Sequence, residues 1–428
     1  MTERLGRSKA SAMSGSDSAG AARDVRMRGF QSRTPADDVL AWIDEHSAPL
    51  ASERVALSNL HGRVLAADVT SPIDVPAFDR SAMDGFALRS DETVGAGDYN
   101  PLSFAVVGAA MPGQAFDGLL QPGQAVRIMT GAPIPDGADA VVPVEYATER
   151  DGCVEITSAV PALKHIGRTG EDVRSGTVVL SSGHRLRPQD VGLLASVGQA
   201  NVEVVRQPRV RLIVTGNELA EPGKSKQPFQ IYEANSHIVT GLVARDGGAN
   251  FERVRCRDER DEIAAAITAP GGEVVLVSGG SSVGSEDHAP SIVRELGELP
   301  IHGVAMRPSS PAGVGRVGDA LVFLLPGNPV SCLCAYDFFA GRAIRRLGGL
   351  PGEWPYQKTC GTLASKIVSQ IGRVDYCRVR VADGVIEPLA LSGASILSST
   401  TRATGFVVVP ASSEGCAVGT EIDAWLYG

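Results

Sequence analysis

The stretch EVVLVSGGSSVGSEDH, residues 273–288, decides how the middle of the chain folds. It begins with four consecutive apolar residues, Val274 to Val277, a pattern typical of a strand that is buried on both faces. A run of glycine and serine follows, and then two carboxylates, Glu286 and Asp287. Glycine-rich loops offer backbone N–H groups that suit an anion, whereas carboxylates repel one. The stretch therefore predicts a buried strand that opens into a binding loop with mixed charge preference.

Three further segments of the same kind lie on either side of this one. Each combines an apolar or alternating strand with a helix that begins after a loop. The expected strands are 210–214, 251–256, 273–277 and 320–325, and the expected helices begin near 235, 260, 290 and 328. Regular alternation of strands and helices predicts a doubly wound α/β domain around a parallel sheet. In such a sheet, ligands bind beyond the carboxyl ends of the strands.

All four strand ends carry polar groups that suit a binding site. Glu218, Asp258 and Asp287 follow the first three strands, and Asn328 with Pro329 begins the helix after the fourth. Each acid alone also fits a solvated loop, and the glycine turn alone fits ordinary turn chemistry. Together they favour a phosphorylated small molecule, because glycine N–H groups and a helix start hold phosphate oxygens. Mg²⁺ between phosphate and carboxylates would reconcile the charges.

The rest of the chain divides by composition into further regions. The expected boundaries are 1–30 for a disordered tail, 31–206 for an elongated amino-terminal domain, 207–348 for the α/β domain and 349–428 for a small β domain. Thr34 and Pro35 are typical of the start of the first helix. Short β-like runs between Pro-Gly turns predict a β-rich insert at about 76–150.

Composition and charge argue against several classes of partner. The chain has 428 residues, a formal net charge of −9 and 5% aromatic residues, so neither a basic stripe nor stacking rings favour nucleic acid. No apolar run approaches the roughly 18 residues of a membrane-spanning helix. Seven cysteines, an odd number without a C-x-x-C pair, argue against a disulfide framework or a zinc site. We expect a cytoplasmic protein that binds neither nucleic acid nor membrane.

Six motifs in a fixed order resemble a known family. They are RSAMDGFAL (80–88), IMTGAPIPDGADAVV (128–142), GRTGEDVRSG (167–176), TGNEL (215–219), SGGSSVG (278–284) and LPGNPVS (325–331). The set closely resembles the molybdopterin molybdenumtransferase family, which includes the MoeA-type enzymes and the gephyrin E domain. The resemblance covers about residues 31–428. No single motif is decisive, but the ordered set is highly specific.

The resemblance implies an architecture and an activity. The architecture is an elongated domain with a β insert, a central molybdopterin-binding α/β domain and a carboxy-terminal β domain. The implied reaction inserts molybdenum from molybdate into adenylylated molybdopterin and releases AMP with the help of Mg²⁺. Family members form homodimers in which the α/β cleft of one subunit faces the β-rich region of the other. The molybdopterin adenylyltransferase of the same pathway is a further candidate partner.

The resemblance also implies roles for individual residues. Catalytic roles fall on Glu218, Asp258 and Asp287, and on Asp84 and Asp172, which would reach the cleft from the partner subunit, as would Thr130. Asp258 and Asp287 are the expected metal ligands. The expected binding residues are Thr130, Gly279, Gly280, Ser281, Gly284, Arg307, Pro326, Gly327, Asn328, Pro329 and Arg373.

One segment departs from the family pattern. The family typically has KPGKP after the strand at 301–306, with another lysine a few residues upstream. In this chain Arg307 replaces the first lysine, Ser309 the glycine and Ser310 the second lysine, and Gly303 stands at the upstream position. Because arginine is a planar fork rather than a point charge, and two cations are missing, the segment predicts weaker attraction of molybdate. Arg373 is a candidate replacement cation.

Two other hypotheses therefore stay open. The chain is either a pterin-binding scaffold that has lost metal insertion, or an enzyme of nucleotidyl transfer or nucleotide hydrolysis that acts on a related pterin nucleotide. Release of AMP without insertion of metal distinguishes the second from the first.

Overall fold

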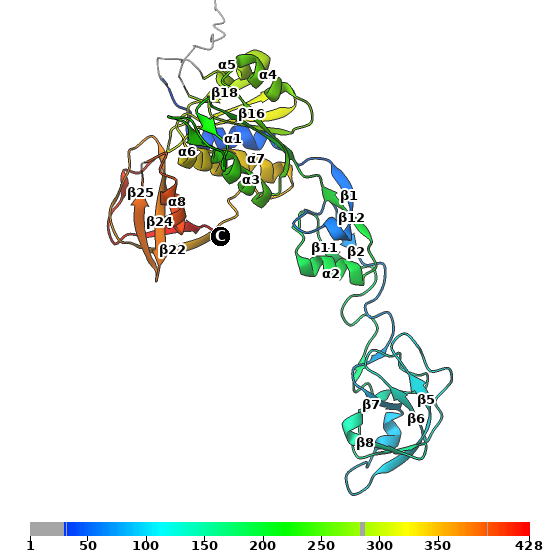
Figure 1. Cartoon of the computed structure of the whole chain (residues 1–428). Coiled ribbons are helices and arrows are strands. Elements are labelled where there is room, and N and C mark those ends of the chain that lie inside the picture. Colours follow the sequence, from blue (N-terminus) through cyan, green and yellow to red (C-terminus); the bar gives the residue numbers. More distant parts are fainter. Residues whose placement is uncertain (1–29, 31, 283–286, 392) are drawn as a thin grey trace, which may run out of the picture.

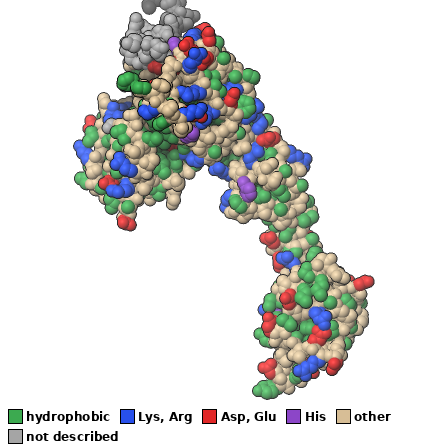
Figure 2. Space-filling view, in the orientation of Figure 1, with side chains coloured by type: hydrophobic (Ala, Val, Ile, Leu, Met, Phe, Trp, Pro, Cys, Tyr) green, Lys and Arg blue, Asp and Glu red, His purple; other side chains and the backbone are tan. Residues whose placement is uncertain are grey.

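The computed structural model describes residues 30, 32–282, 287–391 and 393–428. The chain forms an elongated molecule, with an α/β unit and a β-barrel unit at one end and a β-rich unit at the other (Figure 1). A narrow connecting unit joins the two ends. On the face shown in Figure 2, Asp and Glu side chains lie among Lys and Arg side chains. The described part of the chain contains no helix that is long and apolar enough to cross a membrane.

The α/β unit is built on a six-stranded sheet. Its strands run in the order β16 (Ala249–Cys256), β13 (Arg209–Thr215), β17 (Val274–Ser278), β21 (Ala320–Leu325), β20 (Gly313–Val317) and β18 (Glu298–His302). The four strands expected from the alternating pattern pair in parallel, which confirms the doubly wound α/β domain. β18 and β20 add an antiparallel edge that the alternation did not predict.

Helices cover both faces of this sheet because its central strands are apolar on both sides. Leu276 and Phe323 enter one core, whereas their neighbours Val275 and Val322 enter the other, as the two-residue period of a strand requires. The first face carries α1 (Ala36–His46), α3 (Asn235–Arg245), α6 (Pro329–Ala335) and α7 (Gly341–Leu347), and the second carries α4 (Arg260–Thr268) and α5 (Ala289–Leu296). A π-helical turn, η4 (Tyr336–Ala340), joins α6 to α7.

The first helix packs on the α/β unit, although it precedes the connecting unit in sequence. Val39 and Ile43 of α1 are 0% exposed in the core on the first face of the sheet. The Arg342 guanidinium donates from two nitrogens to the Asp44 carboxylate, at 2.6 Å each, and these bonds lower the pKa of Asp44. Thr34 does not cap the helix as predicted, because α1 begins at Ala36. Thr34 instead forms a parallel bridge with Val304, which lies in the strap, the segment 303–305 that leads toward Arg307.

The connecting unit and the β-rich unit are formed by the segments that follow. In the connecting unit β1 (Ser52–Ala56) pairs with β12 (Asn201–Val205), β2 (Val69–Thr70) pairs with β11 (Val178–Leu180), and α2 is Pro188–Ser196. The β-rich unit has the strand order β7 (Ala140–Pro143), β4 (Gly85–Leu88), β6 (Gln124–Ile128), β5 (Leu102–Ala110), β9 (Cys153–Ile156) and β8 (Ala147–Arg150). β3 (Arg80–Ser81) pairs with β10 (Ile166–Gly167) where the chain enters and leaves this unit.

The carboxy-terminal unit closes into a small barrel. Its strands run in the order β24 (Val374–Ala382), β25 (Val385–Ala390), β22 (Gln357–Leu363), β28 (Glu421–Leu426) and β26 (Gly405–Val409), and β26 pairs back to β24. A short helix, α8 (Ser398–Arg402), lies beside β24. β19 (Met306–Arg307), which follows the α/β strand β18 in sequence, pairs in parallel with β24. This pairing carries Arg307 to the boundary between the α/β unit and the barrel.

Replacing Ile43 with alanine is expected to lower the free energy of unfolding of the α/β unit by about 3 kcal/mol, because the change leaves a cavity in a packed core. Trp42, Trp354 and Trp425 all pack against the same core, so tryptophan fluorescence during denaturant unfolding measures the effect. Ile73→Ala is the matched control, since that side chain is 41% exposed and its loss is expected to change stability little. An unchanged midpoint for Ile43→Ala would contradict the packing of α1 on this unit.

Candidate functional site

Two neighbouring clefts open where the parallel strands end. The acidic cleft has a volume of about 640 Å³ and is lined by the loops that follow these strands, with four carboxylates from Glu218, Glu233, Asp258 and Asp287. The arginine cleft has a volume of about 670 Å³ and is lined by Arg33, Arg307 and Arg373. The clefts share a wall formed by Pro311, Pro326 and Asn328. Among the described lining residues, the acidic cleft has no Lys or Arg and the arginine cleft has no Asp or Glu.

The loop after β17 requires glycine because it lies against the end of β13. Gly279 and Gly280 have φ angles of +97° and +56°, a region that glycine occupies without steric cost. A Cβ at Gly279 would lie 2.4 Å from the carbonyl oxygen of Thr215. Ser281 follows, and its carbonyl oxygen accepts a hydrogen bond from His302 Nε2 at 2.9 Å. Burial lowers the pKa of His302. The ring is therefore favoured in its neutral form, in which Nε2 carries the proton that it donates to Ser281.

The three acids predicted from the strand ends lie in one cleft. Asp258 Oδ2 accepts the backbone N–H of Asn217 at 2.8 Å, which ties together the loops after β13 and β16. Asp287 lies across from Gly280, where a Cβ would be 3.9 Å from Asp287 Oδ1. Glu218 also lines this cleft. The tertiary fold therefore gathers carboxylates that are up to 69 positions apart along the chain.

Glu233 contributes a fourth carboxylate to the acidic cleft, but its side chain is already hydrogen-bonded to the start of α3. It accepts the backbone N–H of Ser236 at 2.7 Å and also the Ser236 hydroxyl group. These contacts satisfy a backbone donor in the first turn of α3, as capping side chains do. Glu233 is therefore a positioning residue for α3 rather than a free ligand-binding acid.

The donor set of the acidic cleft fits a magnesium ion that shares its coordination with a substrate. The described residues contain no group of three or more His, Cys, Asp or Glu side chains arranged to hold a metal by themselves. Mg²⁺ usually takes only one or two carboxylates and completes its shell with phosphate oxygens and water. Asp258 and Asp287 supply two carboxylates from adjacent loops of one cleft, which matches that requirement.

The start of α6 differs from the expected helix start with backbone N–H groups free to bind phosphate. Asn328 stands at the N-cap position and Pro329 begins the helix, and both line the acidic cleft together with Pro326 and Gly327. The backbone N–H of Val330, however, donates to the carbonyl oxygen of Ala394 at 2.9 Å. That first-turn donor is therefore not available to an anion, and the glycine loop after β17 is the better phosphate contact.

Two buried polar side chains of this cleft were missed by sequence reasoning. Asn235 donates from Nδ2 to Gly327 O at 2.8 Å and to Ser278 Oγ at 2.9 Å, so it joins the ends of β17 and β21. Asn235 Oδ1 and Thr215 Oγ1 are buried and have no hydrogen-bond partner among the described residues. Both residues line the acidic cleft. The only sequence signal was their position beside strand and helix ends.

Three other predicted site residues lie on distant parts of the chain. Asp84 Oδ1 accepts the backbone N–H and the hydroxyl of Thr130, at 2.7 Å each, and these bonds lower the pKa of Asp84. The backbone N–H of Asp172 donates to Val75 O at 3.0 Å, near the base of the β-rich unit. Figure 1 shows this unit at the far end of the molecule from the α/β unit. Gly284, also a predicted binding residue, lies outside the described residues.

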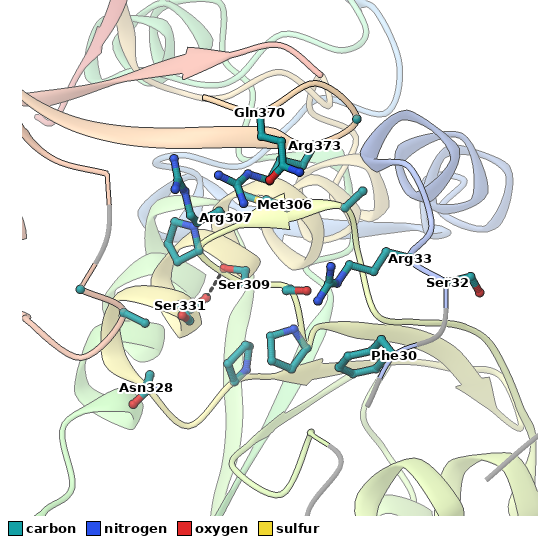
Figure 3. Close-up of a pocket in the computed structure, with 18 of the residues that line it drawn as sticks. Phe30, Ser32, Arg33, Met306, Arg307, Ser309, Asn328, Ser331, Gln370 and Arg373 are labelled. Atoms are coloured by element: carbon teal, nitrogen blue, oxygen red, sulfur yellow. Dashed lines mark hydrogen bonds between the residues drawn. The ribbon is translucent and has the colours of Figure 1, made fainter. Parts of the chain in front are cut away.

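The arginine cleft is organised around one buried carboxylate. Asp375 is 0% exposed and accepts from Arg307, from Arg373 Nε at 3.0 Å and from Ser369 Oγ at 2.8 Å. Two guanidinium groups therefore share a single negative charge, and both still line the cleft (Figure 3). The predicted replacement cation, Arg373, thus lies beside Arg307, and Arg33 adds a third positive charge that the sequence did not indicate.

Ser309 keeps a glycine-like backbone in the departing segment. Its φ angle is +89°, a region that costs a residue with a side chain about 1–3 kcal/mol. The side chain is 2% exposed, and its hydroxyl donates to Ser331 O at 2.6 Å. The chain therefore adopts a left-handed conformation at this position in spite of the side chain.

The fold and the cleft together define a class of protein, namely one with a doubly wound α/β unit whose parallel strands end at an acidic cleft. Three family models agree: the MoeA N-terminal region (domain I and II) matches residues 34–198, a probable molybdopterin binding domain matches 211–346, and the MoeA C-terminal region (domain IV) matches 361–427. The chain belongs to the molybdopterin molybdenumtransferase (MoeA) family.

Similar proteins and structures cover nearly the whole chain. It is 35% identical to molybdopterin molybdenumtransferase 2 of Mycobacterium tuberculosis over 385 residues, which is 87% of this chain and 94% of that protein. It is 33% identical to the molybdopterin molybdenumtransferase of Bacillus subtilis over 404 residues, 92% of this chain and 94% of that protein. A molybdopterin biosynthesis MoeA protein of Pyrococcus horikosii superposes with a TM-score of 0.77 at 31% identity, over 92% of this chain and 99% of that one.

Ser309→Gly is expected to give a more stable protein than Ser309→Ala, by about 1 kcal/mol. Both substitutions remove the hydrogen bond to Ser331, so they differ mainly in the backbone cost of a φ angle of +89°. Thermal unfolding of the two variants, each compared with the unchanged protein, measures the difference. An alanine variant as stable as the glycine variant would contradict the left-handed backbone at this position.

Proposed function

We propose that this protein acts in molybdenum cofactor biosynthesis and inserts molybdenum from molybdate into adenylylated molybdopterin, with release of AMP. Relatives named molybdopterin molybdenumtransferase support this reaction class. The observation that carries the proposal is the wall that the acidic and arginine clefts share, formed by Pro311, Pro326 and Asn328. One cleft suits a pterin nucleotide and the other an oxyanion, so the two substrates would meet at this wall.

In this proposal the acidic cleft holds the pterin nucleotide. The N–H groups of a pterin ring would donate to a carboxylate of this cleft. Glu218 would accept from the ring in this way or orient the reacting centre. Backbone N–H groups of the loop at Gly279 and Gly280 would face the phosphates. Asp258 and Asp287 would hold Mg²⁺ together with phosphate oxygens, and the ion, when bound, neutralises negative charge at the phosphate bond that is cleaved.

The arginine cleft would bind molybdate. Molybdate is a tetrahedral dianion, and a guanidinium fork donates two parallel hydrogen bonds to such an oxyanion. Arg307 and Arg373 are held in place by Asp375, so little side-chain entropy remains to be lost when an anion binds. The glycine-like backbone at Ser309 keeps the surrounding segment in a shape that leaves the cleft open.

We also propose that the active form is a homodimer. Asp84, Thr130 and Asp172 lie on the β-rich part of the molecule, far from the acidic cleft of the same chain (Figure 1). A second subunit would bring these residues to the cleft. The molybdopterin adenylyltransferase that makes the substrate is a candidate partner of the dimer. We further propose a reducing, cytoplasmic setting, as the odd number of cysteines without a C-x-x-C pair suggests.

The decisive experiment supplies the purified protein with adenylylated molybdopterin, molybdate and Mg²⁺, and measures AMP and protein-bound molybdenum cofactor. Formation of both products supports the proposal. AMP without inserted molybdenum would instead support a nucleotide hydrolase. Tight binding of the pterin nucleotide with neither product would identify a scaffold. The absence of a cation at positions 303 and 310 makes the scaffold the main competing hypothesis.

Asp258→Asn and Asp287→Asn are each expected to lower kcat/KM for AMP release at least about tenfold, which corresponds to roughly 1.4 kcal/mol. The amide keeps the size of the side chain and, at position 258, its hydrogen bond to Asn217, but removes the charge that attracts Mg²⁺. Asp261→Asn is the matched control, because Asp261 is an exposed acid on α4 that lines neither cleft. Equal activities of all three variants would exclude the proposed metal ligands.

Ser310→Lys is expected to strengthen molybdate binding, by roughly 1 kcal/mol. Ser310 lines the arginine cleft, so the ammonium group of a lysine at this position would enter the cleft. Equilibrium dialysis with molybdate measures the change, with Ser310→Gln as the uncharged control of similar reach. Equal affinities of the lysine and glutamine variants would count against this cleft as the molybdate site.

A further inference from the structure

The described residues that precede α1 form part of the wall of the arginine cleft. Thr34 forms a parallel bridge with Val304, in which the N–H of Thr34 donates to Gly303 O at 2.9 Å and the N–H of Ala305 donates to Thr34 O at 2.8 Å. Phe30, Ser32 and Arg33 line the cleft next to this bridge. Two backbone hydrogen bonds therefore fix the amino-terminal segment against the strap that leads into Arg307.

Phe30 occupies the space that a side chain at position 303 would need. Gly303 has a φ angle of +96°, and a Cβ there would lie only 2.5 Å from Phe30 Cδ1. The same ring packs edge-on against His302, with ring centroids 5.1 Å apart. A lysine at position 303 is incompatible with this packing. The glycine that removes a cation from the strap is thus also the residue that lets the amino-terminal segment dock.

Arg33 is the least neutralised cation of the cleft. Arg307 and Arg373 both pair with Asp375, whereas no described residue forms an ion pair with Arg33, whose lining neighbours in this cleft include no carboxylate. Figure 3 shows the Arg33 side chain extending into the pocket toward Ser309. A dianion in the cleft would therefore find in Arg33 a positive charge that is not shared with a protein acid.

We propose that Arg33 is a specificity-determining residue that contacts the oxyanion, and that the docked amino-terminal segment supplies the charge which the 303–311 segment lacks. The inference rests on the proposed use of the arginine cleft for molybdate. It explains how a chain with serine at 309 and 310 and glycine at 303 still presents three guanidinium groups to a tetrahedral dianion. Phe30 acts as a positioning residue, since its uncharged ring packs on Gly303 and His302 and holds the segment in place.

The test is the affinity of the full-length protein for molybdate, measured by isothermal titration calorimetry at low ionic strength. Arg33→Ala is expected to raise Kd about five- to tenfold, because one charge-assisted contact is lost. Arg33→Lys is expected to lie between Arg33→Ala and the unchanged protein. Phe30→Ala is expected to raise Kd as well, although it removes no charge. Arg150→Ala removes an exposed arginine of the β-rich unit that lines neither cleft; it controls for the change in net charge and is expected to bind as the unchanged protein does.

Each outcome decides between distinct conclusions. Weaker binding for Arg33→Ala and Phe30→Ala, with Arg150→Ala unaffected, supports the inference. Equal weakening for Arg33→Ala and Arg150→Ala would overturn it in favour of a general charge effect, and no weakening in any variant would overturn it while leaving the proposed function intact. If the unchanged protein binds no molybdate, both the inference and the insertion step fail. A separate titration with the pterin nucleotide then tells whether the acidic cleft still functions.

Discussion

The buried carboxylate of Asp375 is the contact on which the arginine cleft depends. It is 0% exposed and accepts hydrogen bonds from Arg307, Arg373 and Ser369. Removing this carboxylate would leave two neighbouring guanidinium groups without their shared counter-charge. Because Asp375 lies on β24 and Arg307 on β19, the same contact fastens the barrel to the α/β unit. The barrel region and the α/β unit thereby line the arginine cleft together.

The separation of charge between the two clefts follows from how their walls are built. The acidic cleft takes its residues from the loops after the parallel strands, where the acids Glu218, Asp258 and Asp287 lie. The arginine cleft forms where the strap after β18 meets the barrel and the segment before α1. The carboxylates of the one cleft and the guanidinium groups of the other thus line neighbouring spaces that share a wall. That arrangement suits a reaction between a metal-bound nucleotide and a free oxyanion, which would otherwise compete for the same cations.

The departures from the family pattern are linked by packing rather than independent. Gly303 makes room for Phe30, Phe30 and Arg33 line the same cleft, and Ser309 has the left-handed backbone that favours glycine. A comparison of the sequence with the family pattern shows only that lysines are missing. In the folded chain, the positive charge of the cleft comes from Arg33, Arg307 and Arg373, which lie on three segments that are far apart in sequence.

The sequence alone was sufficient for the doubly wound α/β unit, for its parallel strands and for the gathering of Glu218, Asp258 and Asp287, because strand periodicity and the rule of carboxyl ends are local or topological. It was not sufficient for the contacts between units. The docking of α1 on the α/β core, the closure of the barrel and the position of Arg33 in the arginine cleft depend on surfaces that no periodic pattern encodes. Tertiary packing decided them, since buried area and shared charges arise only when distant segments meet.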